Sequence, residues 1–537
     1  MGNADSSGAS DSDGRNGRPP AALSITSYAS ASLAVNVMSI VVLGYATRAL
    51  TLEEMGLVVA FRVLITLAFM LSELGMGQGL VRLLSGTSES IAGKARIVSA
   101  SITIRVLPAV LGAAILYLFS PLIGASLLSE NVTLLFEILA IDVVLNPVTG
   151  ILENALIGLE RAPLQSSLRL FSNAVGATVS VVLLFYEYGP LSLVIGYIAT
   201  DATQCLGGIA ALRWMEFLVR PSGYDVRTIA SRLFALSGPL VISNITGLLL
   251  GQFDRAFILV FFALSQAAEY GVATTIYTSI VVVLSSAIGT IAFPRFSAAY
   301  DHGTHQLQSS VMMSLRLSSI IMFPILFGLM SVSSDLVIII AGNSYSDAAL
   351  PFVIFVAFAL LRPLWISVSG VPVILGLAKK QAAIGVGAVL AEVLLAVTLI
   401  PVMSNALLAT VSSVSSSIVI VGTWILVNDR FRLPFDWRLS VRLALLGGIQ
   451  VFVSLVVAAV TRGIVMEIIV KVFAGLSVYL IGFRVMSIVR PSDLEDVNQL
   501  TGGRVVRLLG LAARILAVEW ERPLSADSSP KGGKASS

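Results

Sequence analysis

The sequence predicts an all-α membrane protein that crosses the bilayer many times. Hydrophobic residues make up 56% of the 537 residues and charged residues only 12%, and the mean hydropathy is +0.92. A soluble protein carries about 25% charged residues. Apolar runs of roughly 20 residues, the length that crosses the hydrocarbon core as a helix, recur along the whole chain. The polar stretches between them are shorter than the ~50 residues of a small soluble domain, so we expect no extramembrane domain.

Cutting the apolar runs at glycine, proline and charged residues predicts about fourteen spans. Their approximate limits are 26–50, 55–82, 97–120, 130–158, 164–187, 189–212, 232–264, 267–294, 307–331, 347–375, 381–401, 405–428, 439–461 and 464–487.

The two ends of the chain are polar. Residues 1–22 are rich in Ser, Gly and Asp and lack the basic start and apolar centre of a secretory signal, so we expect a disordered cytoplasmic tail. Residues 491–537 are expected to form a second cytoplasmic tail. The single cysteine, Cys205, excludes an intrachain disulfide and a cysteine metal cluster. His302 and His305 lack the shell of carboxylates that a metal site would need, and we expect neither a metal nor a cofactor.

Lys and Arg gather in every second connection between the spans. If the N-terminus lies inside, the even-numbered connections hold Arg82, Lys94, Arg96, Arg161, Arg169, Arg213, Arg220, Arg227, Arg232, Arg295, Lys379, Lys380, Arg430, Arg432, Arg438 and Arg442. The odd-numbered connections hold Arg48, Arg462 and Lys471. Because positive residues stay on the cytoplasmic side, this pattern predicts a multi-pass protein of the cytoplasmic membrane with both termini in the cytoplasm. The net charge of +3 therefore reflects topology and gives no support for nucleic-acid binding.

A short internal repeat predicts how the spans are grouped. ALTLEEMG (49–56) precedes the second span and ALSQAAEYG (263–271) precedes the eighth, and each ends in a glycine that opens the next helix, Gly56 or Gly271. We therefore expect two six-helix lobes, 23–216 and 217–430, followed by two additional helices in 431–490. Transporters built from repeats often bind their substrate between the lobes.

Three segments resemble a known family. GYATRALTLEEMGLVVAFRVLITLAFMLSELGMGQGLVRLL (44–84) resembles the first two helices of Wzx-type polysaccharide flippases, which belong to the MOP superfamily with MATE exporters and lipid II flippases. FDRAFILVFFALSQAAEYGVATTIYTSIVVVLSSAIGTIAFPRFS (253–297) is similar to the family's seventh and eighth helices, and AGNSYSDAALPFVIF (341–355) to the connection into helix ten. The matching residues are Arg48, Gly56, Leu74, Gly75, Arg82, Asp254, Arg255, Gly271, Tyr277, Phe293, Pro294 and Arg295. The resemblance covers about residues 25 to 430.

Charged residues inside the predicted spans are the candidates for a site, because a charge at mid-bilayer costs at least about 2.5–3.5 kcal/mol. They are Arg62, Glu73, Arg105, Glu137, Asp142, Glu153, Asp201, Asp254, Arg255, Arg316, Arg362 and Glu392. Arg105 and Arg316 lie near predicted cytoplasmic ends, and we expect structural roles for both. We also expect a structural role for Glu392, because the family's outer helices do not line the cavity.

The resemblance implies a water-filled slot lined by helices 1, 2, 7 and 8, with parts of 4 and 10. Arginine suits phosphate because its planar guanidinium donates two parallel hydrogen bonds. Candidate substrate-binding residues are therefore Arg62, Arg255 and Arg362 in the slot, Arg48 at its outer rim, and Asn36 and Asn244 for sugar hydroxyls. Asp142 or Asp254 would balance an arginine or bind the coupling ion. Packing between helices is the alternative role for each residue.

The function expected from the resemblance is a flippase, and not an enzyme. It would move a lipid-linked oligosaccharide, a polyprenyl or dolichyl phosphate or diphosphate glycan, across the cytoplasmic membrane by alternating access for surface polysaccharide or glycoprotein synthesis. Its partners would be that glycan, membrane lipids, H⁺ or Na⁺ as coupling ion, and glycan-assembly proteins. One alternative is a MATE-like cation-coupled exporter, whose slot should be dominated by acids. Another is a membrane-embedded glycan polymerase or ligase, which needs a sizeable outer loop.

Overall fold

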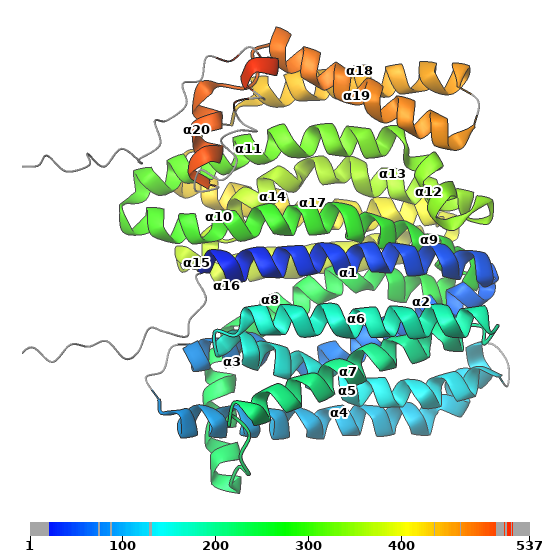
Figure 1. Ribbon diagram of the computed structural model, residues 1–537, viewed down its shortest axis with the longest axis vertical. Coiled ribbons are helices and arrows are strands. Elements are labelled where there is room, and N and C mark those ends of the chain that lie inside the picture. Colours follow the sequence, from blue (N-terminus) through cyan, green and yellow to red (C-terminus); the bar gives the residue numbers. More distant parts are fainter. Residues whose placement is uncertain are drawn as a thin grey trace, which may run out of the picture. The chain divides into compact units, whose positions relative to one another are not determined.

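The computed structural model describes residues 21–73, 76–85, 89–127, 131–433, 435–461, 463–500, 510, 513–516 and 518. Residues 1–20 of the predicted N-terminal tail lie outside this part of the chain. The described residues form helices and no strand, as the composition predicts (Figure 1). In a bilayer a helix satisfies its backbone hydrogen bonds within one segment, which is why apolar runs adopt it.

The helices follow one another along the chain as α1 (Ala21–Ala49), α2 (Leu52–Glu73), α3 (Met76–Ser85), α4 (Ile91–Leu127), α5 (Asn131–Gly158), α6 (Ala162–Phe185), α7 (Leu191–Trp214), α8 (Gly223–Phe261), α9 (Leu264–Tyr277), the π-helix η1 (Thr278–Val282), α10 (Val283–Asp301), α11 (Thr304–Ser331), α12 (Ser333–Ala341), the 3-10 helix η2 (Asn343–Ala348), α13 (Ala349–Phe358), η3 (Ala359–Leu361), α14 (Arg362–Val368), α15 (Val371–Ile374), α16 (Ala378–Leu399), η4 (Ile400–Val402), α17 (Asn405–Phe431), α18 (Trp437–Val460), α19 (Ile464–Val485) and α20 (Pro491–Leu500).

Among the described residues, twelve helical segments are long and apolar enough to cross a membrane, which confirms a multi-pass membrane protein. Helices α2 and α8 overlap the two remaining predicted spans, 55–82 and 232–264. The predicted span 55–82 is made of two helices, α2 and α3, and the Leu74 and Gly75 of the family pattern fall at 74–75, outside the described residues. Two short helices, α12 and α20, were not predicted.

The turn between α8 and α9 comes earlier than predicted, because the seventh span was expected to continue to residue 264. Helix α8 ends at Phe261, and Phe262 and Ala263 adopt extended backbone angles before α9 begins at Leu264. The side chain of Gln266 accepts a hydrogen bond from the backbone N–H of Ala263 at 3.3 Å and so caps α9. Arg255 remains inside the helix, but about 9 Å from its end at 1.5 Å per residue instead of roughly 13 Å.

The chain divides into two compact units. Unit 1 comprises Met1–Ala287, Val337–Phe355 and Leu375–Gly422, and unit 2 comprises Ile288–Leu336, Val356–Ile374 and Thr423–Ser537. These units reflect packing and not sequence repetition, so the division into lobes at 23–216 and 217–430 remains a prediction.

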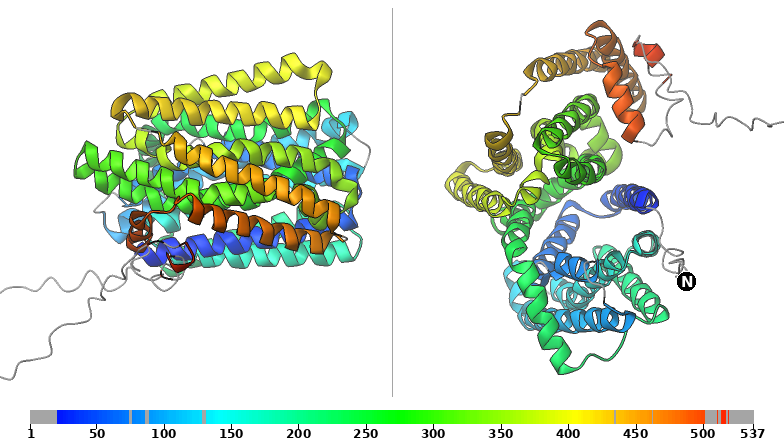
Figure 2. Two further views of the ribbon diagram at one scale, coloured as in Figure 1. Left: turned by 90° about the horizontal axis from the view of Figure 1, so that it is seen from above. Right: turned by 90° about the vertical axis from the view of Figure 1, so that its left-hand side faces the viewer.

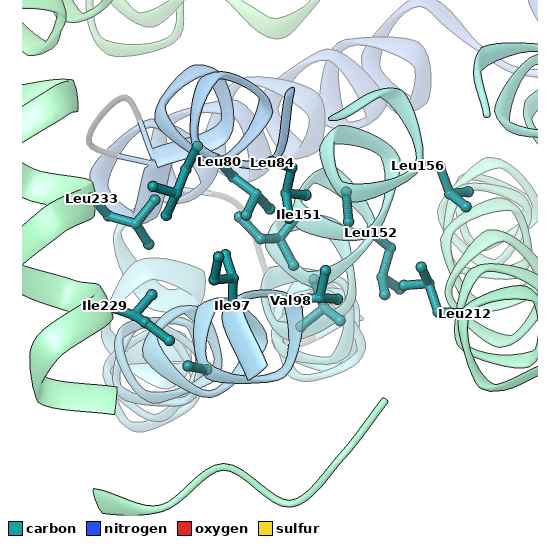
Figure 3. Close-up of a cluster of buried hydrophobic side chains, with 14 of the residues drawn as sticks. Leu80, Leu84, Ile97, Val98, Ile151, Leu152, Leu156, Leu212, Ile229 and Leu233 are labelled. Carbon is teal, nitrogen blue, oxygen red and sulfur yellow. The ribbon is translucent and has the colours of Figure 1, made fainter. Parts of the chain in front are cut away.

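Unit 1 is held together by pairs of long helices. Helix α6 packs along α7, α4 along α5, α1 along α6 and α2 along α9. A cluster of buried aliphatic side chains joins α3, α4, α5, α7 and α8, as Figure 3 shows; its labelled members are Leu80, Leu84, Ile97, Val98, Ile151, Leu152, Leu156, Leu212, Ile229 and Leu233. Such close van der Waals packing is the main source of helix association in lipid.

In unit 2 the last two membrane helices, α18 and α19, lie side by side and pack on α11 (Figures 1 and 2). Glycines allow the close approach: a Cβ atom added to Gly447 would lie 2.2 Å from the ring of Phe327. The buried core of this bundle consists of Phe323, Leu439, Leu443, Leu446, Tyr479 and Ile488.

Ion pairs fix the ends of these helices in unit 2. The guanidinium of Arg316 on α11 donates to both carboxylate oxygens of Asp493 on α20, at 2.7 and 3.0 Å, and to the carbonyl of Ile488 at 2.6 Å. The expected structural role of Arg316 is consistent with these contacts. Through them the start of the predicted C-terminal tail, helix α20, is fastened to the membrane helices.

Candidate functional site

The two glycines of the internal repeat both lie where α2 and α9 pack together. A Cβ atom on Gly56 would lie 2.2 Å from the carbonyl oxygen of Leu264, and one on Gly271 would lie 2.4 Å from a methyl group of Val59. Separations below 3.0 Å do not occur for real Cβ atoms, so only glycine permits this approach. The repeat thus marks a contact between the two segments that carry it.

Next to this crossing lies a cavity of about 100 Å³, lined by α1, α2, α6, α7 and α9. Its wall is apolar except for Arg62 and a few neutral polar side chains, which are Ser39, Asn173, Ser180, Tyr197, Thr200 and Thr275. The Arg62 guanidinium stands 5.6 Å from the centre of the Tyr197 ring, a cation–π distance. Arg62 thus lines this cavity, and its predicted contact with a substrate stays a prediction.

Arg255 on α8 is the second predicted cation, and it lies close enough to Arg62 for the two positive charges to repel. Its Nη1 donates to Gln252 at 3.5 Å, which is a long hydrogen bond, and its Nε is buried with no hydrogen-bond partner among the described residues. Two arginines of unit 1 therefore stand near each other, the exposed Arg62 and the half-buried Arg255.

The neighbouring carboxylate of Asp254 is turned towards other partners. One oxygen accepts from the backbone N–H of Arg255 at 2.8 Å, and the other accepts from the hydroxyl of Tyr270 on α9 at 2.6 Å. Asp254 is only 4% exposed and Tyr270 is fully buried. Its charge still attracts the Arg255 guanidinium, so Asp254 partly balances the arginine; its role in transport stays a prediction.

Glu392 on α16 joins this cluster, which the sequence interpretation did not foresee. It is 1% exposed, and neither carboxylate oxygen has a hydrogen-bond partner within 3.5 Å among the described residues. It interacts electrostatically with Asp254, and Ser412 of α17 lies beside it. An acid in the middle of an apolar helix was the available signal, but nothing in the sequence pointed to Asp254 as its neighbour.

Asp142 on α5, the other predicted coupling residue, is 1% exposed and lies against Asp201 on α7. The amide of Asn146, one turn along α5, donates to Asp201 at 2.8 Å. The structure therefore brings two deep acids together, on helices that pack side by side.

Three predicted residues have other surroundings. Arg48, predicted at the outer rim, is exposed and donates to the carbonyl groups of Ile339 at 2.6 Å and Ile340 at 2.7 Å, and so caps the last turn of α12. The half-buried Asn36 donates to the carbonyl of Ser32 in its own helix at 2.7 Å. Arg362 begins α14 and is half-buried.

Asn244, the remaining candidate, lies in α8, and its side chain is outside the described part of the chain. Whether any of these residues touches a substrate stays a prediction.

Comparison with solved structures identifies the fold. The chain is similar to the lipid II flippase MurJ in an inward closed conformation, with a TM-score of 0.69, 13% identity, and coverage of 87% of this chain and 99% of that one. It is also similar to an inward-facing multidrug resistance MATE transporter of the MOP superfamily, with a TM-score of 0.54, 12% identity, and coverage of 76% and 98%. A third similar structure is a MOP superfamily transporter from Pyrococcus furiosus. Its TM-score is 0.52 at 12% identity, and the match covers 76% of this chain and 95% of that one.

These likenesses confirm the predicted MOP-type fold. No curated protein matches the chain by sequence. The sequence pattern of the family described as "Polysaccharide biosynthesis protein" matches residues 46–350, more than half of the chain, and the protein therefore belongs to that family.

Proposed function

We propose that this protein flips a lipid-linked oligosaccharide across the cytoplasmic membrane. The observation that carries the proposal is the pair of neighbouring arginines, Arg62 and Arg255, held inside a membrane protein of the polysaccharide biosynthesis family. Two neighbouring positive charges, of which only Arg255 is partly balanced by Asp254 among the described residues, are costly in a membrane protein unless an anion or water solvates them. The phosphate or diphosphate that links lipid to glycan supplies such an anion, and guanidinium groups bind it bidentately.

The surroundings of Arg62 suit the sugar portion of such a substrate. The cavity beside it presents hydroxyl and amide groups on an otherwise apolar wall, together with the ring of Tyr197. A few placed polar groups on an apolar surface are typical of small-molecule sites. The resemblance to MurJ, which is described as a lipid II flippase, supports the same class of substrate.

Asp254, Tyr270 and Glu392 are proposed to bind the coupling ion. Asp254 and Glu392 are both almost fully buried, and Asp254 sits beside Arg255 in the chain. Binding H⁺ or Na⁺ there would cancel negative charge next to Arg255 and so strengthen its field towards a phosphate. Release of the ion would restore the Asp254–Arg255 attraction and weaken the hold on the substrate.

A cation-coupled exporter is the second candidate, because the buried acids Asp142, Asp201, Asp254 and Glu392 are the type of residue that attracts organic cations. The chain's similarity to MATE transporters supports it. Family membership and the two arginines favour the flippase.

Depletion of the protein in its host tests the two functions against each other. A flippase requires a lipid-linked glycan to accumulate on the cytoplasmic face, where a non-permeant glycosidase added to right-side-out vesicles does not reach it. Unchanged glycans together with greater sensitivity to cationic drugs would favour the exporter. Rescue with Arg255→Ala should fail, whereas rescue with Arg430→Ala, a change at an exposed arginine at the end of α17, should succeed.

A further inference from the structure

A second group of polar side chains, separate from Arg62 and Arg255, connects the helices α5, α6 and α7. Its deep end is the pair Asp142 and Asp201, whose carboxyl groups lie within hydrogen-bonding reach of each other. Asn146 supplies one amide donor, to Asp201, while Asp142 Oδ1 is buried without a partner among the described residues. Two carboxylates that face one another in an apolar interior repel strongly, and one proton shared between them removes that repulsion.

The pair has few other charges around it. On α7 the buried thiol Cys205 interacts with Asp201, and on α5 Glu153 does so. The nearest cation in this chain of groups, Arg169 of α6, acts on Glu153. From α4, the buried Arg105 faces the ring of Phe69, 5.2 Å from its centre.

Pro147 marks the same place on α5. A proline inside a helix cannot donate to the carbonyl four residues earlier, which here is that of Val143, the residue after Asp142. The Val143 carbonyl therefore lacks the backbone N–H donor that a regular helix would supply, and it lies next to Asp142 in the chain. This feature is independent of the carboxylates and is suited to an ordered water or a hydrogen-bonded proton carrier.

Towards the carboxyl ends of α5 and α7 the polar chain continues. The amide of Gln204 donates to Glu153, and the hydroxyl of Ser172 donates to Gln204 at 2.9 Å. Gln204 is 7% exposed and Ser172 is fully buried. Glu153 lies five residues before the end of α5, about 8 Å at 1.5 Å per residue. The chain thus leads from the acid pair to the connections that the Lys and Arg pattern predicts to be cytoplasmic.

We infer that Asp142 and Asp201 together bind one exchangeable proton, which reaches them from the cytoplasmic side past Glu153 and Gln204. A proton fits better than Na⁺, because the pair offers two carboxyl groups and an amide that presents its N–H to Asp201, whereas a metal cation of this kind takes about six oxygen ligands. The use of this proton in transport rests on the proposed function, but its binding does not.

Infrared spectroscopy of the purified full chain in lipid bilayers tests the binding without any substrate. The protein should carry Glu392→Gln, so that this buried acid gives no signal. The C=O stretch of a protonated carboxyl group should then be present at neutral pH and should lose intensity in either Asp142→Asn or Asp201→Asn. Glu137→Gln is the matched control, because it alters another acid of α5 that precedes Asp142. It should leave the band unchanged.

Two results would overturn the inference. The first is a protonated-carboxyl band that persists in both Asp142→Asn and Asp201→Asn. The second is loss of that band when Na⁺ is added at fixed pH to the protein in which Asp142 and Asp201 are intact. If one variant does not insert, the other decides, and the pH titration of the parent protein must show release of a single proton.

Gln204→Leu tests the route of the proton. It should slow deuterium exchange of the band; an unchanged exchange rate would rule out the route past Gln204. Failure of the unsubstituted protein in a flippase assay, while the band behaved as expected, would count against the proposed function alone.

Discussion

The two units differ in how their positively charged side chains are paired with acids. In unit 2 the ammonium group of Lys471 on α19 is held by Asp335 at 2.7 Å and by Glu467 at 2.6 Å. In unit 1 the guanidinium of Arg255 has one long hydrogen bond to Gln252, and its nearest acid bonds to a tyrosine. A cation surrounded by carboxylates is a structural joint between helices. A cation left short of partners has charge available for a ligand, which is why Arg255 and not Lys471 is the candidate for substrate binding.

Arg255→Ala should have the largest effect on function. Removing a charge that pairs with a buried phosphate costs about 2–5 kcal/mol, which is on the order of a 100-fold loss of transport. Glycan export in the depleted host, complemented by each variant, measures this. Arg255→Lys keeps the charge but not the planar fork and should recover only part of the activity. Normal export by Arg255→Ala would remove this residue from the mechanism.

Lys471→Ala should have the largest effect on stability. It leaves Asp335 and Glu467 buried without their cation, and breaking a buried pair from one side costs about 3–5 kcal/mol. Thermal unfolding of the purified protein in detergent should show a clear fall in Tm. The triple variant Lys471→Gln, Asp335→Asn and Glu467→Gln removes all three charges and should recover most of that loss; equal instability of the single and triple variants would contradict the pairing.

Gly56→Ala should destabilise the crossing of α2 and α9. The added methyl group meets the Leu264 carbonyl, a backbone atom that cannot rotate away, and overpacking of this kind costs about 1–3 kcal/mol. Gly251→Ala on α8 is the matched control, because a Cβ there meets no atom within 4 Å. The Tm of the control should be unchanged or slightly raised, and a similar fall in both variants would refute the close contact.

Arg48→Ala should have the smallest effect of the four. The arginine is exposed and its hydrogen bonds go to the carbonyl groups of Ile339 and Ile340, so its loss should cost about 1 kcal/mol. Glycan export should change by no more than about fivefold, since 1.4 kcal/mol corresponds to a tenfold effect. A loss comparable to that of Arg255→Ala would instead support the rim role predicted from the sequence.

Hydropathy and charge were enough to predict the helices but not their partners. The apolar runs located the spans, because a segment must be apolar over its full length to lie in lipid, whatever it packs against. Arg62 was a candidate because of its depth and the family resemblance, and it lines a cavity of unit 1. The neighbours of Arg48 are about 290 residues away in the chain, and the contact of Glu392 with Asp254 depends on how α16 packs on α8. Such contacts leave no local pattern in the sequence.

The contact between Gly56 and the Leu264 carbonyl has a mechanical consequence. Where leucine side chains separate two helices, small displacements are absorbed by changes of rotamer, and the helices can slip past each other. A contact made by backbone atoms cannot relax by a change of rotamer, so a displacement of α2 should displace α9 as well. Any force applied to one of them, for example by a ligand drawn to Arg62, is delivered to the helix that carries Tyr270.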